Sequence, residues 1–125
     1  MAKNILVIDD DQLVVKTIAR YLKSCGYTVE AVTSGADAIN KVEATPFSLI
    51  IADIRMPGMD GIETIKKLRL VSQDKHKTRI PEIIITGYAS EEAQKEAADL
   101  GVADYIYKPF DVSTFIAAVK RNLQE

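Results

Sequence analysis

The sequence has little of the material that several common classes of protein require. Its one cysteine, Cys25, cannot form an internal disulfide, and because it continues an apolar helical stripe we expect a buried structural thiol. The formal charge of −2 lacks the basic excess that nucleic-acid-binding surfaces usually show. No apolar run approaches the roughly 18 residues of a membrane span, and we expect no signal peptide. These absences predict a cytoplasmic protein that contacts no membrane and binds no nucleic acid directly.

The composition is that of one ordinary globular domain. The chain has 125 residues, of which 47% are hydrophobic and 27% charged, so it can bury a core without a disulfide or a structural metal. No linker, repeat or low-complexity segment interrupts it. We expect a single domain over residues 1–125, with no output domain in this chain.

Five short apolar runs alternate with longer amphipathic stretches. The first, third and fourth runs are nearly continuous in Ile, Leu and Val, which is typical of parallel strands buried on both faces. The alternation predicts an α/β fold of the doubly wound (βα)5 type, with helices on both faces of a parallel five-stranded sheet. The five runs are Ile5–Ile8, Thr28–Val32, Ser48–Ala52, Glu82–Thr86 and Asp104–Tyr107.

The stretches between the runs carry helix signals. Ser34 is the expected N-cap of the second helix and Asp111 that of the last. By contrast, Ser72–Arg79 is polar and basic, so we expect a solvated loop in which His76 has no partners for a metal site. The apolar stripes are Val14, Val15, Ile18, Tyr21 and Leu22; Ala38, Ile39 and Val42; Ile62, Ile65 and Leu68; Ala93, Ala97 and Leu100; and Val112, Phe115, Ile116, Val119 and Leu123.

Polar residues end or directly follow four of the predicted strands. The first strand is followed by Asp9-Asp10-Asp11, the third by Asp53, the fourth ends in Thr86, and the fifth is followed by Lys108. Ligands of open α/β sheets bind outside the carboxyl ends of the strands, so we expect these groups to meet at one edge. Crowded carboxylates need a cation, and magnesium shares one or two carboxylates with phosphate oxygens. A lysine and a hydroxyl complete a site suited to phosphoryl transfer, in which a carboxylate can be the nucleophile.

Over almost its whole length the chain resembles the response-regulator receiver domains of bacterial two-component systems, and in particular the chemotaxis regulators. The most specific of the four motifs that carry the resemblance is the run from Asp53 to Gly61. All four occur in order and at suitable spacing. They are Ile8-Asp9-Asp10, Asp53-Ile54-Arg55-Met56-Pro57-Gly58-Met59-Asp60-Gly61, Thr86-Gly87 and Lys108-Pro109-Phe110.

The resemblance implies a phosphoacceptor and a metal site. Asp53 corresponds to the aspartate that receives the phosphoryl group. Asp10, Asp53 and the backbone carbonyl of Arg55 would hold Mg²⁺, and Asp9 would assist directly or through water. The phosphoryl donor would be a sensor histidine kinase or a histidine phosphotransfer protein. The domain would be no ordinary enzyme, but a switch that catalyses its own phosphorylation and dephosphorylation.

The resemblance also implies how the phosphoryl group is sensed. Lys108 would contact it, Thr86 would hydrogen-bond to it, and Tyr105 would be the switch aromatic, although a half-buried strand tyrosine is the plainer interpretation. The family's sheet order is 2-1-3-4-5, which is the flavodoxin-like order. Its Lys108-Pro109 bond is commonly cis.

Three residues near the site have other expected roles. Arg55 and Tyr88 are large residues at positions that the family leaves open. We therefore expect them to be rim modulators that obstruct an attacking water and slow hydrolysis, although an exposed rim without kinetic effect is equally compatible with the sequence. Asp11 is the expected N-cap of the first helix.

The fourth helix is the expected moving part. Its inward stripe is mainly alanine, whereas the fifth helix offers Phe115, Val119 and Leu123. Because burial contributes roughly 0.8 kcal/mol per methylene, the alanine helix should be held less firmly. The fourth helix, the fifth strand and the fifth helix are therefore the expected output surface.

Three alternatives remain at this point. A phosphatase of the haloacid-dehalogenase type would use Asp9 as nucleophile and Asp11 as acid/base, but it would leave the run after Asp53 unexplained. A flavodoxin-like cofactor binder would need a glycine-rich phosphate loop where three aspartates stand. A degenerate receiver that only docks partners would not need the complete set of acidic, Thr and Lys residues.

Overall fold

Strands and helices alternate along the chain. The computed structural model describes residues 3–53, 55–56, 59–87 and 90–124, with side chains described for these except 55–56 and 59–60. The strands are β1 (Asn4–Ile8), β2 (Thr28–Val32), β3 (Leu49–Asp53), β4 (Arg55–Met56), β5 (Met59–Asp60), β6 (Glu82–Thr86) and β7 (Asp104–Tyr107). The helices are α1 (Gln12–Ser24), α2 (Gly35–Ala44), α3 (Gly61–His76), α4 (Glu91–Leu100) and α5 (Val112–Leu123).

Five strands form one parallel sheet in the order β2-β1-β3-β6-β7. Without the two-residue strands β4 and β5, this is the expected order 2-1-3-4-5, so the α/β fold is confirmed. The sequence did not predict β4 and β5, which form a short antiparallel pair directly after β3.

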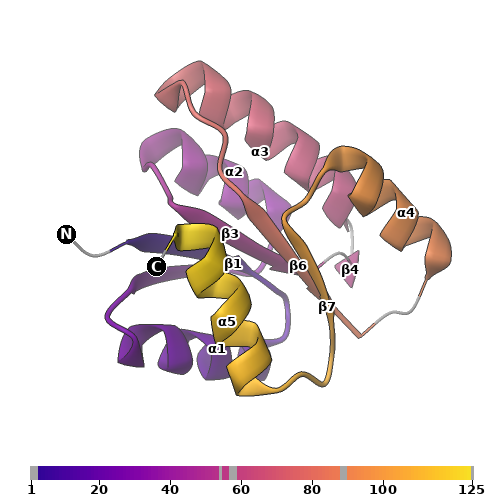
Figure 1. Cartoon of the computed structure of the whole chain (residues 1–125). Coiled ribbons are helices and arrows are strands. Elements are labelled where there is room, and N and C mark those ends of the chain that lie inside the picture. The colour runs from indigo at the N-terminus through magenta and orange to yellow at the C-terminus, as the bar shows by residue number, and fades with distance from the viewer. Residues whose placement is uncertain (1–2, 54, 57–58, 88–89, 125) are drawn as a thin grey trace.

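Two layers of helices cover the sheet. Figure 1 shows α2, α3 and α4 on one face and α1 and α5 on the other. The central strands β3 and β6 are buried along their whole length, as their continuous apolar runs predicted. Alternate residues of each strand therefore enter two separate cores, one under each helical layer. Among the helices of the described residues, none is both long and apolar enough to cross a bilayer.

Polar caps fix where the helices begin. The Asp11 carboxylate accepts hydrogen bonds from the backbone N–H groups of Leu13 and Val14, and the Ser34 hydroxyl accepts one from that of Asp37. Both caps confirm the sequence prediction. Asp111 does precede α5, but its side chain makes no capping hydrogen bond.

The prediction of a loop over Ser72–Arg79 was wrong in its first half. Helix α3 continues to His76. The buried Ser72 hydroxyl donates to the Thr78 carbonyl at 2.8 Å, and His76 Nε2 lies 2.6 Å from the Val42 carbonyl oxygen of α2. These long-range contacts stabilise the end of a helix whose polar composition alone predicts a loop.

The prediction of a buried thiol was also wrong. Cys25 is exposed, because α1 ends at Ser24 and Cys25 is already its C-cap. The chain then turns through Gly26, with φ of +93°, and it is Tyr27 that enters the core beside Ile18 and Leu22.

Candidate functional site

The predicted site residues do meet at the carboxyl edge of the sheet. Asp9 follows β1 and Asp53 ends β3, and these strands are paired so that Ile8 lies opposite Ala52. Thr86 ends β6, the next strand, which is paired with β7. Lys108 follows β7, and its backbone N–H donates to the Thr86 carbonyl at 2.8 Å.

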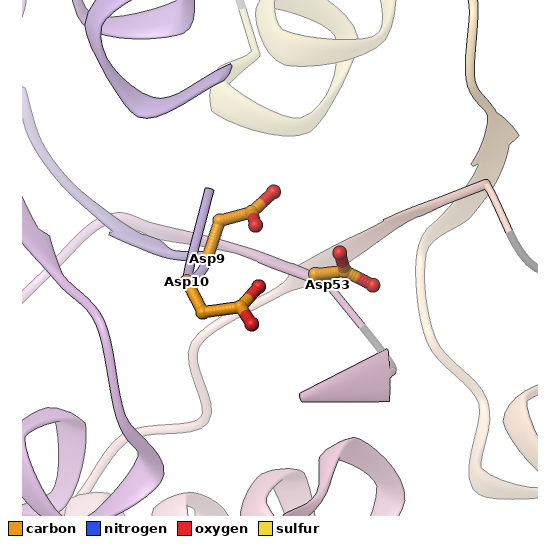
Figure 2. Close-up of side chains that lie close together, drawn as sticks. All are labelled: Asp9, Asp10 and Asp53. Atoms are coloured by element: carbon orange, nitrogen blue, oxygen red, sulfur yellow. The ribbon is translucent and has the colours of Figure 1, made fainter. Parts of the chain in front are cut away.

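Three carboxylates share one small space. Oxygen atoms of Asp9, Asp10 and Asp53 all lie within 4.8 Å of one another, and Figure 2 shows the Asp10 carboxylate directed toward Asp53. Asp9 and Asp53 are buried, whereas Asp10 is exposed. We call these three residues the carboxylate cluster. Oxygen ligands grouped in this way suit a hard divalent cation.

Lys108 supplies a cation to the carboxylate cluster. Its ammonium group donates to Asp9 Oδ2 at 2.9 Å and to Asp53 Oδ2 at 3.1 Å. Burial alone would lower the pKa of Lys108, but these two carboxylates outweigh it and raise the pKa above its ordinary value. Lys108 therefore stays charged at neutral pH. The Lys108-Pro109 peptide bond that follows is cis, as the family resemblance implied.

Asp9 is held from two sides. Its Oδ1 accepts a hydrogen bond from the Asp11 backbone N–H at 2.9 Å, while Oδ2 accepts from Lys108. Burial is the largest influence and raises the pKa of Asp9, and the charge of Asp53 acts in the same direction. Among the side chains that the structure describes, three carboxylates face one ammonium group, and such an acidic group suits a divalent cation.

Thr86 and Tyr105 occupy neighbouring strands near the carboxylate cluster. Thr86 is buried at the end of β6, and Tyr105 is half-buried in β7. The Tyr105 hydroxyl is buried and has no hydrogen-bond partner among the described residues. The ring of Tyr107 packs edge-on against the ring of Tyr105, with centroids 5.3 Å apart. Such a hydroxyl is unusual, because most buried polar atoms are paired.

The two expected rim residues cannot be placed at the site. Arg55 lies in β4, where its backbone pairs opposite Asp60, but its side chain is outside the described residues. Tyr88 is outside them altogether. The expectation that Arg55 and Tyr88 slow hydrolysis of the phosphorylated form stays a prediction.

Comparison of the chain with models of protein families shows which family it belongs to. The model of the response regulator receiver domain matches residues 5–120 of the chain. The chain is a member of that family. The phosphatase alternative finds no support, and in this receiver domain Asp11 has the capping role described above rather than that of an acid/base.

Relatives and solved structures agree with this assignment. The transcriptional regulatory protein ZraR of Escherichia coli K12 is 35% identical over 120 residues, which are 96% of this chain and 26% of ZraR. HprR of the same organism is 33% identical over 97% of this chain and 52% of its own length. The receiver domain therefore spans about a quarter to a half of these regulators.

Among solved structures, a CheY-like receiver domain protein from Methanospirillum hungatei JF-1 superimposes with a TM-score of 0.90 at 29% identity, covering 99% of this chain and 95% of that one. A response regulator from Burkholderia pseudomallei gives 0.83 at 30% identity, covering 98% and 69%. That structure contains a phosphorylated aspartic acid, a calcium ion and citrate.

One surface beside the site was missed by the sequence analysis. An apolar groove of about 450 Å³ lies between α1 and the segment after β7. Leu13 is 73% exposed there, and Val112, which we expected to face inward, is exposed as well. The available signal was Leu13 itself, an apolar residue off the helical stripe that is separated from the three aspartates only by Gln12. The groove lining includes Leu13, Val14, Tyr21, Lys108, Phe110 and Val112.

Proposed function

We propose that this receiver domain accepts a phosphoryl group on Asp53 from a histidine kinase or a histidine phosphotransfer protein, with Mg²⁺ as cofactor. The observation that carries the proposal is the carboxylate cluster bridged by Lys108, in which Asp53 shares the ammonium group with Asp9. The aspartyl phosphate and calcium ion of the Burkholderia structure support the same chemistry on the same fold.

The transfer needs an oxygen nucleophile and groups that neutralise the phosphoryl oxygens. An Asp53 carboxylate oxygen forms the new P–O bond while the P–N bond to the donor imidazole breaks, and the donor nitrogen retains that electron pair. The Lys108 ammonium group and the Thr86 hydroxyl donate hydrogen bonds to the transferred group. Asp9, Asp10, Asp53 and the Arg55 carbonyl would hold Mg²⁺, which neutralises charge on the phosphoryl oxygens when bound. The same groups would serve the domain's own phosphorylation and dephosphorylation.

The apolar groove is the place where the donor protein would dock. A phosphohistidine must reach Asp53 from outside the sheet edge, so its protein must cover the neighbouring surface. Lys108 lines the groove as well as the site, and the exposed Leu13 offers apolar area to bury. The surface of α4, β7 and α5 would then transmit the signal to the downstream target. We take residues 1–125 as one cytoplasmic domain, whose output lies elsewhere in its own or another protein.

Incubation with acetyl phosphate and Mg²⁺, followed by intact-mass measurement, tests the proposal. The wild-type protein should gain one phosphoryl group that base removes and acid preserves, and Asp53→Asn should abolish the gain. Asp74→Asn is the matched control, because Asp74 is exposed on α3. A gain that survives in Asp53→Asn but disappears in Asp9→Asn would overturn the assignment of Asp53.

A further inference from the structure

The carboxyl end of α4 is held by side chains from other elements. The last turn of α4 contains no basic residue, so the helix itself provides no cation for its terminal carbonyl groups. Arg69 of α3 donates from Nη1 to the Leu100 carbonyl at 2.6 Å. Arg79, in the segment before β6, donates from Nη2 to the Gly101 carbonyl at 2.8 Å. Two guanidinium groups from other segments therefore bind the carbonyl groups at the end of α4, as basic residues in the last turn of a helix usually do.

A buried carboxylate fixes these guanidinium groups. Glu82, the first residue of β6, is 1% exposed and accepts from Arg69 Nε at 2.8 Å and from Nη2 at 2.9 Å. This two-point contact holds the plane of the guanidinium group, and it raises the pKa of Arg69. Arg79 Nη2 lies 3.9 Å from the same carboxylate. We call Arg69, Arg79 and Glu82 the arginine cluster.

The rest of α4 is attached more loosely. Ala97 is its one buried residue. Nearer its amino end, the Tyr107 hydroxyl donates to Gln94 Oε1 at 3.0 Å, and both side chains are exposed. A neutral exposed hydrogen bond is weaker than one to a charged group. Among the contacts of the described residues, attachment of α4 is therefore strong at its carboxyl end and weak toward its amino end.

We propose that the arginine cluster is a fixed pivot for α4, so that the helix swings about its carboxyl end while the Tyr107–Gln94 contact changes. This inference rests on the proposed function, because phosphorylation of Asp53 supplies the driving force at the Thr86 end of β6. Glu82 and Thr86 are the two ends of the same buried strand. One strand therefore connects the pivot to the residue expected to sense the phosphoryl group.

Amide hydrogen exchange measured by NMR on the full chain tests the pivot without any phosphoryl group. In Arg69→Gln, exchange of the amides from Ala98 to Ala103 should be about tenfold faster or more, the scale of one lost hydrogen bond to a charged group. Arg79→Gln should also speed up exchange of these amides. Because it keeps the Arg69–Glu82 pair, it replaces Arg69→Gln in the experiment if that variant does not fold. Arg20→Gln, an exposed arginine on α1, should change nothing there. Unchanged exchange at 98–103 in Arg79→Gln would overturn the proposal.

Beryllofluoride with Mg²⁺, a phosphoryl mimic, tests the swing. In the wild-type protein, amide shifts in the first turn of α4 should change more than those at 99–101. In Arg79→Gln the changes in amide shift should extend into the last turn of α4. If Thr86 and its neighbours do not respond at all, the proposed function fails. If they respond and α4 changes evenly along its length in the wild-type protein, the pivot alone is wrong.

Discussion

Two charge clusters lie at opposite ends of β6 and differ in their balance. At the amino end, the arginine cluster surrounds one buried carboxylate with two guanidinium groups, whose remaining donors reach backbone carbonyls. At the carboxyl end, the carboxylate cluster has three acids and one ammonium group. The first arrangement therefore gives its one carboxylate more cations than it needs, whereas among the described side chains the second has more carboxylates than cations.

This difference separates a structural cluster from the cluster that we propose to be functional. A satisfied cluster gains nothing from a ligand, and removing one partner leaves a buried charge alone. An unbalanced cluster is costly by itself and gains when a cation arrives. Burial alone does not distinguish them, since Glu82, Asp9 and Asp53 are all buried. The two clusters differ instead in the number of cations and hydrogen-bond donors around each carboxylate.

The largest expected effect comes from breaking the arginine cluster. Arg69→Met leaves Glu82 buried and without its two-point partner, so we expect the free energy of unfolding to fall by about 3 kcal/mol. Lys66→Met is the matched control on the same helix. It removes an exposed pair with Glu63 and should change the same quantity by less than about 0.5 kcal/mol. Urea denaturation measures both, and equal effects would show that burial of the pair is irrelevant.

A smaller effect should come from supplying the cation that the carboxylate cluster lacks. At free Mg²⁺ one hundred times its dissociation constant, the wild-type protein should gain about 2.7 kcal/mol of unfolding free energy. Asp10→Asn removes one acid, so it should lose most of this gain and be no less stable than the wild type without metal. Arg79→Gln, at the other end of β6, should keep the full gain. Equal stabilisation of Asp10→Asn and the wild type by Mg²⁺ would contradict the comparison.

The carboxylate cluster was predictable from the sequence, and the arginine cluster was not. Continuous apolar runs fix where β1, β3 and β6 lie, and parallel strands bring their carboxyl ends together. Asp9, Asp53 and Lys108 then meet whatever the helices do. The Arg69–Glu82 pair has no comparable signal, because Arg69 is one of several basic residues on α3. Which of them turns inward depends on how α3 packs against β6.

Errors at the helix ends have a related physical cause. The end of α3 depends on Ser72 and His76, whose partners Thr78 and Val42 lie in other segments. Periodicity within one helix cannot show such contacts. Cys25 shows the opposite error, since the apolar period continued one residue beyond the true end of α1. Sequence patterns thus locate the interiors of elements better than their ends.

The smallest expected effect is on the pKa of Tyr105, to which the charge of Asp53 in the carboxylate cluster contributes. Burial is the largest cause that raises the pKa of Tyr105 above its ordinary value of 10.0, and Tyr107 and then Asp53 add to it. Because the fold favours the neutral phenol, its contribution to stability is complete below pH 10.0 and is lost as the pH rises through the raised pKa.

Titration of the tyrosine side-chain ¹³C shifts measures this coupling, with Tyr105→Phe to assign the signal. Asp53→Asn removes one of the three causes, so it should move the pKa of Tyr105 down without returning it to the ordinary value. Glu63→Gln, on the exposed face of α3, should leave the titration unchanged. An unchanged pKa of Tyr105 in Asp53→Asn would mean that the excess charge does not reach β7. Any response of Tyr105 to phosphorylation would then have to come through packing alone.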